Sequence, residues 1–389
     1  MKLLILHTHY QQLGGEDQSF ASERILLRDQ GHEVYTLIFQ NQDLNSMSVW
    51  RKAGTSLWNQ AAYRLTRATI QKHRPRIVHI HNTFPLASPG VLHAAKAEGV
   101  PVVMSLRNYR LLCVNGLFFR NGHACERCLR SLSWRGALYG CYRNSRAAST
   151  VVTAMLALHL RLGTWNHVDA FIALTEFSRR KFLEAGFPSE KIAVKPNFMH
   201  HDPGCGDGRG GYALFVGRLS KEKGIATLLT AWSLLKRKVP LKVVGDGPLR
   251  AGVKQAAKVI QKVEYLGSKS PEDVSALMAG ATFLIFPSIC YETFGRVAME
   301  AFATGTPVLA ANIGAVGEIT EHGRTGLHFC PGDPSDLAAK VDWLLSHPEE
   351  LAQMREEARR EYEAKYTAQR NYQMLMNIYE QAFASRNEN

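Results

Sequence analysis

Residues 281–300 read Ala-Thr-Phe-Leu-Ile-Phe-Pro-Ser-Ile-Cys-Tyr-Glu-Thr-Phe-Gly-Arg-Val-Ala-Met-Glu, an apolar run followed by a short loop and a second, mostly apolar stretch. The first run predicts a buried strand that ends near Pro287. A helix is expected from Phe294, and Gly305-Thr306-Pro307 is an ordinary helix exit. A strand followed directly by a helix is the repeating unit of a parallel α/β sheet.

The same alternation recurs along the chain and predicts two doubly wound, Rossmann-like α/β domains. A Gly- and Asp-rich linker, His200–Gly211, marks the boundary between them. We expect a first domain over residues 1–199 and a second over 200–389, whose last helix packs back on the first domain. The strands are expected at Leu3–His7, Glu33–Phe39, Arg76–His81, Pro101–Leu106 and Asp169–Leu174, then at Tyr212–Val216, Leu241–Val244, Val263–Leu266, Thr282–Phe286 and Pro307–Ala310.

Residues 107–165 interrupt the alternation and are interpreted as an insertion in the first domain. Four of the seven cysteines lie within this segment, spaced C-x11-C-x2-C-x12-C. Two thiolates in a C-x2-C pair can share one tetrahedral ion, so a structural zinc site is predicted; unrelated thiols or a redox pair are the alternatives. The predicted ligands are Cys113, Cys125, Cys128 and Cys141, and His123 is a possible substitute for one of them.

The positive charge of the chain is confined to its first half. Residues 1–200 hold 25 Lys/Arg and 12 Asp/Glu, whereas residues 201–389 hold 22 of each. Nucleic acid, an anionic bilayer and an anionic substrate are the partners that such a surface attracts, and a solvated basic face is the plain alternative. A nucleic-acid-binding protein is disfavoured because no basic strand interleaved with aromatics and no zinc-finger helix is present.

No segment is long and apolar enough to span a bilayer. The longest candidate, Ala147–Leu160, contains several hydroxyl residues and is shorter than the ~20 residues that a spanning helix needs. The start, Met1–Leu6, has too short an apolar core for a signal peptide and is expected to be the first strand. We therefore expect a cytoplasmic protein.

Glu292 and Glu300 lie on either side of the predicted helix start, one in the loop and one about two turns into the helix. The open N-terminus of the helix offers unpaired N–H groups to an anion. This arrangement suits a ligand with phosphate in the middle and hydroxylated rings at both ends. A nucleotide sugar is such a ligand.

Glycine-rich loops follow other predicted strands at the edge where this kind of sheet binds ligands. Gly217-Arg218 and Lys223-Gly224 follow the first strand of the second domain, and their two cations can neutralise a diphosphate. Glycines at these turns let a ligand approach the backbone, although plain tight turns give the same pattern. The other such turns are Gly245-Asp246-Gly247-Pro248 and, in the first domain, Gly14-Gly15-Glu16.

As a set, these motifs resemble the retaining glycosyltransferases of family 4, the glycosyl transferases group 1, which have the GT-B fold. The resemblance covers essentially the whole chain. It implies two Rossmann-like domains that face a central cleft, with the acceptor on the first domain and the nucleotide sugar on the second. The motifs that carry it are Glu292-x7-Glu300, Gly217-Arg218…Lys223-Gly224, Gly245–Pro248, Gly314…Glu318 and Gly14-Gly15-Glu16.

The resemblance also implies roles for individual residues. Glu292 would bind hydroxyls of the donor sugar, and Glu300 the ribose of the nucleotide. Arg218 and Lys223 would hold the diphosphate, so no divalent metal would be needed in catalysis. The remaining donor-site residues would be Gly14, Gly15, Gly217, Gly245, Asp246, Phe294 and Gly295, with backbone N–H groups near the last two helping to hold the phosphates.

One position departs from the family pattern. Many relatives carry a histidine after the fourth strand of the first domain, where this chain has Arg107. An arginine cannot act as a general base, but it can hydrogen-bond a sugar hydroxyl or a phosphate, so Arg107 is kept as a donor-site candidate. His79 and His81 lie one strand earlier, and each can line the cleft or be a satisfied core histidine.

Two alternatives keep the same fold and change the reaction: a nucleotide-sugar epimerase and a sugar phosphorylase. For the acceptor we expect a glycan, linked to a lipid, in cell-surface polysaccharide biosynthesis. Aromatic and arginine side chains between Trp134 and Arg146 have the composition of a membrane-interface surface. Peripheral contact with the anionic inner face of the cell membrane is therefore predicted; packing within the insertion is the alternative.

Overall fold

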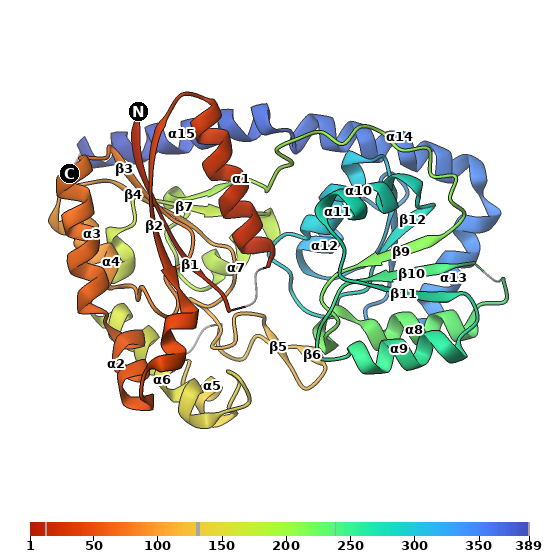
Figure 1. Ribbon diagram of the computed structural model, residues 1–389, viewed down its shortest axis with the longest axis horizontal. Helices are drawn as coiled ribbons and strands as arrows, with labels where there is room; N and C mark the ends of the chain where they lie inside the picture. Colours follow the sequence, from red (N-terminus) through yellow and green to blue (C-terminus); the bar gives the residue numbers. More distant parts are fainter. Residues whose placement is uncertain (12–13, 130–132, 238, 388–389) are drawn as a thin grey trace. The chain divides into compact units, whose positions relative to one another are not determined.

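A computed structural model describes residues 1–11, 14–129, 133–237 and 239–387 of the 389-residue chain. The chain divides into two compact units, which are described separately (Figure 1). Unit 1 consists of Met1–Phe118, Glu126–Pro196 and Asn371–Asn389. Unit 2 consists of Phe119–Cys125 and Asn197–Arg370.

Unit 1 is built on a six-stranded parallel sheet with the order β2-β1-β3-β4-β7-β8. Its inner strands are short aliphatic runs buried on both faces, as a sheet covered by helices on both sides requires. The strands are β1 (Lys2–His9), β2 (Glu33–Gln40), β3 (Ile77–Ile80), β4 (Val102–Ser105), β7 (Ala170–Ala173) and β8 (Ile192–Val194). The helices are α1 (Gly15–Asp29), η1 (Asn41–Ser46), α2 (Val49–Leu57), α3 (Gln60–His73), α4 (Gly90–Ala97), α5 (Trp134–Leu138), α6 (Arg146–Arg161), η2 (Thr164–His167), α7 (Glu176–Glu184) and η3 (Ser189–Lys191).

Unit 2 repeats the architecture with the order β11-β10-β9-β12-β13-β14, again all parallel. Its strands are β9 (Ala213–Val216), β10 (Leu241–Val244), β11 (Val263–Gly267), β12 (Phe283–Phe286), β13 (Val308–Ala311) and β14 (Gly326–Phe329). Its helices are η4 (Lys221–Lys223), α8 (Ile225–Leu234), α9 (Arg250–Val259), α10 (Pro271–Gly280), α11 (Arg296–Ala303), α12 (Gly314–Ile319), α13 (Pro334–Ser346) and α14 (Pro348–Lys365). A two-residue-strand hairpin, β5 (Phe119–Arg120) with β6 (His123–Ala124), is grouped with it. The doubly wound parallel fold expected from the sequence is confirmed.

The strand order of each sheet reverses at one point. In unit 2 the chain moves outward from β9 to β10 and β11, then returns to add β12 on the other side of β9. In unit 1 the corresponding point lies between β1 and β3. In open α/β sheets, the crevice beyond the carboxyl ends of the strands at such a point is the usual ligand site.

The last helix, α15 (Ala368–Asn387), belongs mainly to unit 1. Its apolar residues Leu375, Ile378 and Tyr379 are buried in one cluster with Leu3 and Ile5 of β1. These apolar residues of α15 are thus part of the core of unit 1.

Three details differ from the sequence expectations. Residues 107–165 are not wholly an insertion, because α6 is a crossover helix between β4 and β7 and buries Val152, Met155 and Leu156. Helix α11 begins at Arg296 rather than Phe294, since Gly295 has φ +108° and acts as its N-cap. Strands β8 and β14 were not expected from the sequence.

None of the helices in the described ranges is long and apolar enough to cross a membrane.

Candidate active site

The loop after β9 carries the two cations predicted to bind phosphate. Arg218 is exposed, and its side chain makes no hydrogen bond or ion pair with the part of the chain that the structure describes. Lys223 ends the short helix η4 and points its ammonium at Glu292, with 2.5 Å between Nζ and Oε1. Both residues thus lie at the carboxyl end of β9, at the point where the strand order reverses.

Glu292 lies in the loop between β12 and α11. Its Oε1 accepts hydrogen bonds from Ser288 Oγ at 2.8 Å and from Lys223. The Lys223 and Glu292 side chains are 27% and 18% exposed, so solvent screens the pair only partly. Burial alone would lower the pKa of the Lys223 ammonium, but the Glu292 carboxylate outweighs it and raises that pKa. Lys223 is therefore a fixed cation.

The thiol of Cys290 lies in the same loop, 3.9 Å from Glu292 Oε1. Burial, reinforced by the Glu292 charge, raises the pKa of this thiol well above its usual value. Cys290 is consequently a neutral packing residue and not a nucleophile.

Two glycines hold the loops of this edge together. A Cβ on Gly224 would lie 1.8 Å from the carbonyl oxygen of Pro287, so the glycine allows the β9 loop to pack closely against the β12 loop. A Cβ on Gly245 would lie 1.9 Å from the carbonyl oxygen of Gly217, so this glycine allows the β10 loop to pack closely against the β9 loop. Both have positive φ, so any other residue would be strained as well as obstructed. Asp246, beside Gly245, is exposed and pairs with Arg250 at 3.3 Å.

Helix α11 carries the second predicted carboxylate. Glu300 Oε1 accepts a hydrogen bond from Arg296 Nε at 2.7 Å, one turn earlier on the same face. Both side chains are about four-fifths buried. Phe294 is buried against Tyr366, and Gly295 then turns the chain into the helix, whose first N–H groups lack partners within it. The loop and helix start therefore combine a carboxylate, an ammonium and the N-terminal end of a helix.

In unit 1 the Gly14-Gly15 turn begins α1. The Gly14 N–H donates to Asp17 Oδ2 at 2.8 Å, a backbone cap of the helix. Asp17 Oδ1 also accepts from His7 Nε2 at 2.9 Å and His9 Nδ1 at 2.7 Å. Burial alone would raise the pKa of Asp17, but these hydrogen bonds outweigh burial and lower that pKa. The ionised Asp17 thus ties the turn to the end of β1.

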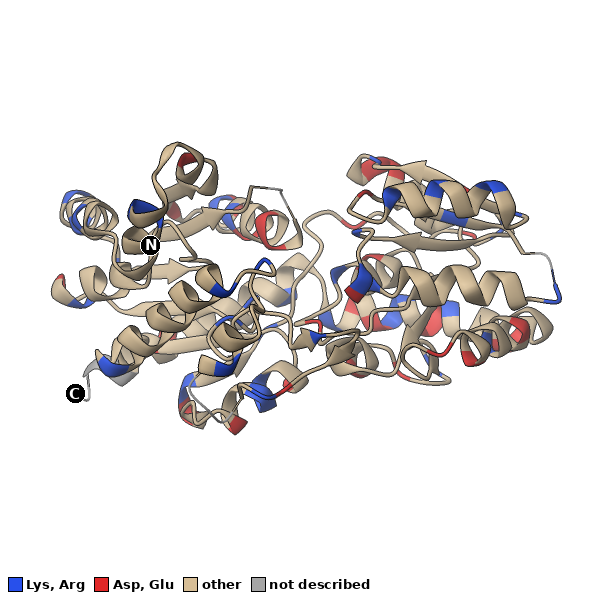
Figure 2. Cartoon of the chain, turned by 90° about the horizontal axis from the view of Figure 1, so that it is seen from below, with Lys and Arg blue, Asp and Glu red and all other residues tan. Residues whose placement is uncertain are grey.

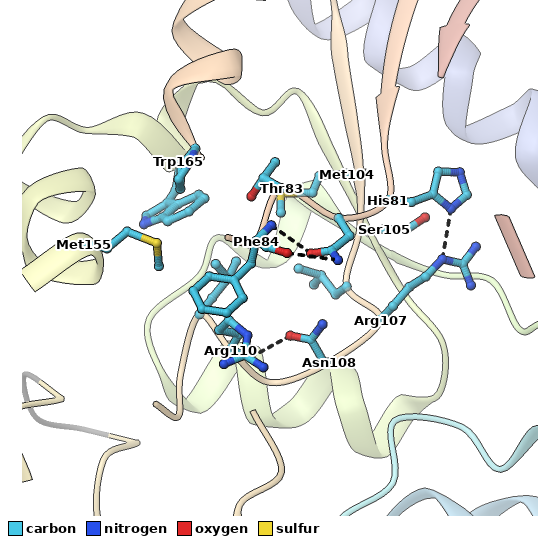
Figure 3. A pocket seen from close by; sticks show the side chains of 14 residues that line it. His81, Thr83, Phe84, Met104, Ser105, Arg107, Asn108, Arg110, Met155 and Trp165 are labelled. Atoms are coloured by element: carbon cyan, nitrogen blue, oxygen red, sulfur yellow. Dashed lines mark hydrogen bonds between the residues drawn. The ribbon is translucent and has the colours of Figure 1, made fainter. Parts of the chain in front are cut away.

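Arg107, the residue that departs from the family pattern, is buried at the end of β4. Its Nε donates to His81 Nδ1 at 3.0 Å, and Nη2 lies 3.7 Å from Glu23 Oε2. Arg107 and His81 also line one side of a pocket in unit 1, which Phe84, Met155 and Trp165 line on the other side (Figure 3). Arg110 stacks on Phe84 at this pocket, 4.2 Å from the ring centroid.

Glu23 on α1 is the centre of a buried polar cluster behind Arg107. It accepts from Lys195 Nζ at 2.9 Å and lies 3.1 Å from His79 and 3.3 Å from His81. Burial opposes ionisation, but Lys195 and its neighbours outweigh it and lower the Glu23 pKa well below its usual range. Burial lowers the pKa of His79 to about 4, so that ring is neutral at pH 7.

Most polar groups of this cluster are hydrogen-bonded; Glu23 Oε1 and His81 Nε2, 3.3 Å apart, make no hydrogen bond with the described residues. His79 is engaged by Tyr379 and Ser105, at 2.8 and 2.9 Å, which makes it a satisfied core histidine. Arg107 donates to Nδ1 of His81, so the proton of the neutral ring lies on Nε2, the atom that faces Glu23. An N–H group in that position cannot be a metal ligand.

The four cysteines predicted to hold zinc form no disulfide. Two groups of three or more possible metal ligands occur within the described ranges, and neither contains a cysteine. Cys113 is buried and donates to Asn115, whereas Cys125 lies in the segment grouped with unit 2. The zinc site therefore stays a prediction for metal analysis.

Sequence reasoning missed several residues that orient the site. Ser288 holds Glu292, Arg296 holds Glu300, and Asp17 holds the Gly14 turn. The spacing of Arg296 and Glu300, four residues apart on a predicted helix, was a usable signal. Glu23 gave no such signal, because its partners His79, Arg107 and Lys195 lie on β3, after β4 and after β8.

Two family models match the chain, "Glycosyl transferase 4-like domain" over residues 24–197 and "Glycosyl transferases group 1" over residues 207–361. The chain belongs to the group 1 glycosyltransferases. Its two Rossmann-like units are those of the GT-B fold, as the resemblance in sequence implied.

Individual relatives agree with this assignment. Glycogen synthase of Mycobacterium tuberculosis is 29% identical over 329 residues, which span 82% of this chain and 71% of that protein. D-rhamnosyltransferase WbpZ of Pseudomonas aeruginosa is 34% identical over 161 residues, 40% of this chain and 42% of that one. HepE of Anabaena, solved in complex with UDP, has the same fold, with a TM-score of 0.69 over 97% of this chain and 99% of that chain at 19% identity.

Proposed function

We propose that this group 1 enzyme is a retaining, metal-independent glycosyltransferase that moves a sugar from a nucleotide-sugar donor to a glycan acceptor. The observation that carries the proposal is the arrangement at the edge of the unit 2 sheet. There Lys223, Glu292 and Glu300 occupy the loop and helix beside the reversal in strand order. HepE of Anabaena has been solved in complex with UDP-glucose, so UDP-sugars are the first donors to test.

Each residue has a role that follows from its charge and position. Arg218, whose side chain is exposed and makes no hydrogen bond or ion pair with the described residues, and Lys223 bind the diphosphate together with the N-terminal end of α11. Glu292 accepts hydrogen bonds from hydroxyls of the donor sugar. Glu300, oriented by Arg296, accepts hydrogen bonds from the ribose hydroxyls.

Fixed cations and helix amides can stabilise the departing diphosphate in place of a divalent ion. The bond between the anomeric carbon and phosphate oxygen breaks, and the acceptor oxygen bonds to the same face of the sugar. The departing phosphate takes the proton of the acceptor hydroxyl.

For the acceptor we propose a lipid-linked glycan of cell-surface polysaccharide biosynthesis, used at the inner face of the membrane. The pocket in unit 1 combines Arg107 and Arg110 with the apolar Phe84, Met155 and Trp165 (Figure 3). Cationic and apolar groups together suit an acceptor that has an anionic linkage next to a hydrocarbon. The basic excess of the first half agrees with an anionic acceptor or surface.

The test is release of nucleoside diphosphate from UDP-, GDP- and ADP-sugars, with a lipid-linked glycan as acceptor and the linkage of the product read by NMR. We expect release that depends on the acceptor and a product with the donor's anomeric configuration. Conversion of the donor to a 2-epimer without acceptor would identify an epimerase. Sugar transfer to inorganic phosphate alone would identify a phosphorylase.

A further inference from the structure

Three helices of unit 1 form a surface without acidic residues. Helix α6 packs against both α2 and α5: His159 Nε2 hydrogen-bonds the Leu57 carbonyl at 2.9 Å, and Thr153 Oγ1 donates to the Ser133 carbonyl at 3.1 Å. We call α2, α5 and α6 the three-helix surface (Figure 1). Its charged side chains are all cationic: Arg51, Lys52, Arg135, Arg146 and Arg161.

Acidic residues are also scarce in the wider region around these helices. Residues 44–168 contain 17 Lys/Arg but only two acidic residues, Glu98 and Glu126. Unit 2 carries both signs of charge along its helices (Figure 2). A basic region so short of acidic residues attracts anionic partners.

Large apolar side chains stand out from the same helices. Trp50 is 87% exposed and Val49 76%, at the start of α2, and Trp134 on α5 is 53% exposed. Trp50 and Trp134 are the two exposed tryptophans among the six of the chain. Leu138 on α5 and Leu160 on α6 are also exposed. A single exposed apolar residue needs no explanation, but such a concentration marks an interaction site.

We propose that the three-helix surface docks the enzyme on an anionic bilayer, with Val49 and Trp50 entering the interface between headgroups and acyl chains. Tryptophan favours this interface, and the adjacent Arg51 and Lys52 can reach lipid phosphates. The other end of α2 is anchored in unit 1, where Leu57 joins the core cluster of Phe84, Val152 and Met155. Since no described helix spans a membrane, the contact is interfacial.

The aliphatic residues decide between a bilayer and a nucleic acid. A single-stranded nucleic acid would reward exposed tryptophans by stacking, but it gains little from Val49, Leu138 and Leu160. A bilayer interface rewards both kinds of side chain. The inference rests on the proposed function, because a lipid-linked acceptor requires the enzyme to work at a membrane.

Vesicle binding by the full-length protein tests the proposal. We expect co-sedimentation with vesicles of equal parts phosphatidylglycerol and phosphatidylcholine at low salt. It should weaken at about 1 M salt, where the screening length is about 3 Å, and be weak with pure phosphatidylcholine. Removing two charges in Arg51→Gln/Lys52→Gln should weaken binding about 25-fold, at about fivefold for each charge near the surface. The matched control on α9 of unit 2, Lys254→Gln/Lys258→Gln, should bind as the wild type does.

The apolar tip is tested separately. Val49→Ser/Trp50→Ser should weaken binding at least tenfold, whereas Val259→Ser, at a residue 72% exposed on α9, should have no effect. In Trp134→Phe protein, acyl-brominated lipids should quench Trp50, the exposed tryptophan that is left. These positions are exposed, so each variant should keep the wild-type melting temperature.

Absence of binding to anionic vesicles, equal losses in the control variants, or an unquenched Trp50 would each overturn the docking surface. Binding to single-stranded RNA that is tighter than to vesicles and lost in Arg51→Gln/Lys52→Gln would identify a nucleic-acid surface instead. Nucleoside diphosphate binding, measured by thermal shift without vesicles, separates the two proposals. If it persists while vesicle binding fails, the docking proposal alone is wrong; if it fails, the proposed function is wrong.

Discussion

Glu292→Gln removes the negative charge beside Lys223 but keeps the size of the side chain and an oxygen for the Ser288 hydrogen bond. If Glu292 binds the donor sugar, the loss falls on the reaction rather than on nucleotide binding. A charge-assisted hydrogen bond in a partly buried site contributes about 1.5–3 kcal/mol. Each 1.36 kcal/mol of barrier is a factor of ten, so turnover should fall between about tenfold and a hundredfold.

The affinity for nucleoside diphosphate should stay the same or increase. In the free protein the Lys223 ammonium is held by Glu292 at 2.5 Å, and the variant releases it for the phosphates. We therefore expect UDP or the preferred diphosphate to bind as well as to wild type, or more tightly. Initial rates with a nucleotide sugar and isothermal titration with the diphosphate measure the two quantities.

Glu264→Gln on β11 is the matched control, because this exposed carboxylate lies on the outermost strand of the same sheet. It should change neither quantity. Wild-type turnover in Glu292→Gln would refute the donor-sugar role. A fall in diphosphate affinity as large as the fall in turnover would show that Glu292 acts on nucleotide binding instead.

Three further predictions concern the same site. Glu300→Ala should weaken diphosphate binding at least tenfold, and unchanged titrations would show that the ribose lies elsewhere. Arg218→Ala should cost about 1.5–3 kcal/mol of diphosphate binding but much less of monophosphate binding; equal losses would mean that it does not read the second phosphate. Sugar transfer should persist in EDTA, and loss that Mg²⁺ or Mn²⁺ restores would contradict metal independence. Elemental analysis for one zinc per chain, with a thiol count, must accompany that assay, because loss of a structural ion would imitate a catalytic requirement.

Much of the fold was predictable because its strands are short apolar runs bounded by glycine-rich turns. Leu241–Val244 was located to the residue, and most other strands to within a residue or two at each end. The order of strands within each sheet was not predictable, since hydrophobic runs do not encode which strands are neighbours. Strands β8 and β14 were missed, because polar residues within or beside them, such as Lys191, Lys195 and His328, break up their apolar runs.

The candidate site shows the same division between local and distant information. Lys223 and Glu292 are 69 residues apart, yet both follow strands of a predicted sheet, so their proximity could be inferred from topology. The environment of Arg107 could not be inferred, because its partner His81 follows β3 and its partner Glu23 lies on α1. His79 depends on Tyr379, which lies 300 residues away on a helix whose docking the local sequence does not encode.

The most direct test of the central claim is isothermal titration of UDP, GDP and ADP into the wild-type protein and into a variant that carries Arg218→Ala and Glu300→Ala together. The account predicts one site per chain for at least one diphosphate in EDTA, and loss of that binding in a variant that melts at the wild-type temperature. Binding of none of the three, or equal binding by the folded variant, would contradict a nucleotide-sugar site at the carboxyl edge of β9 and β12.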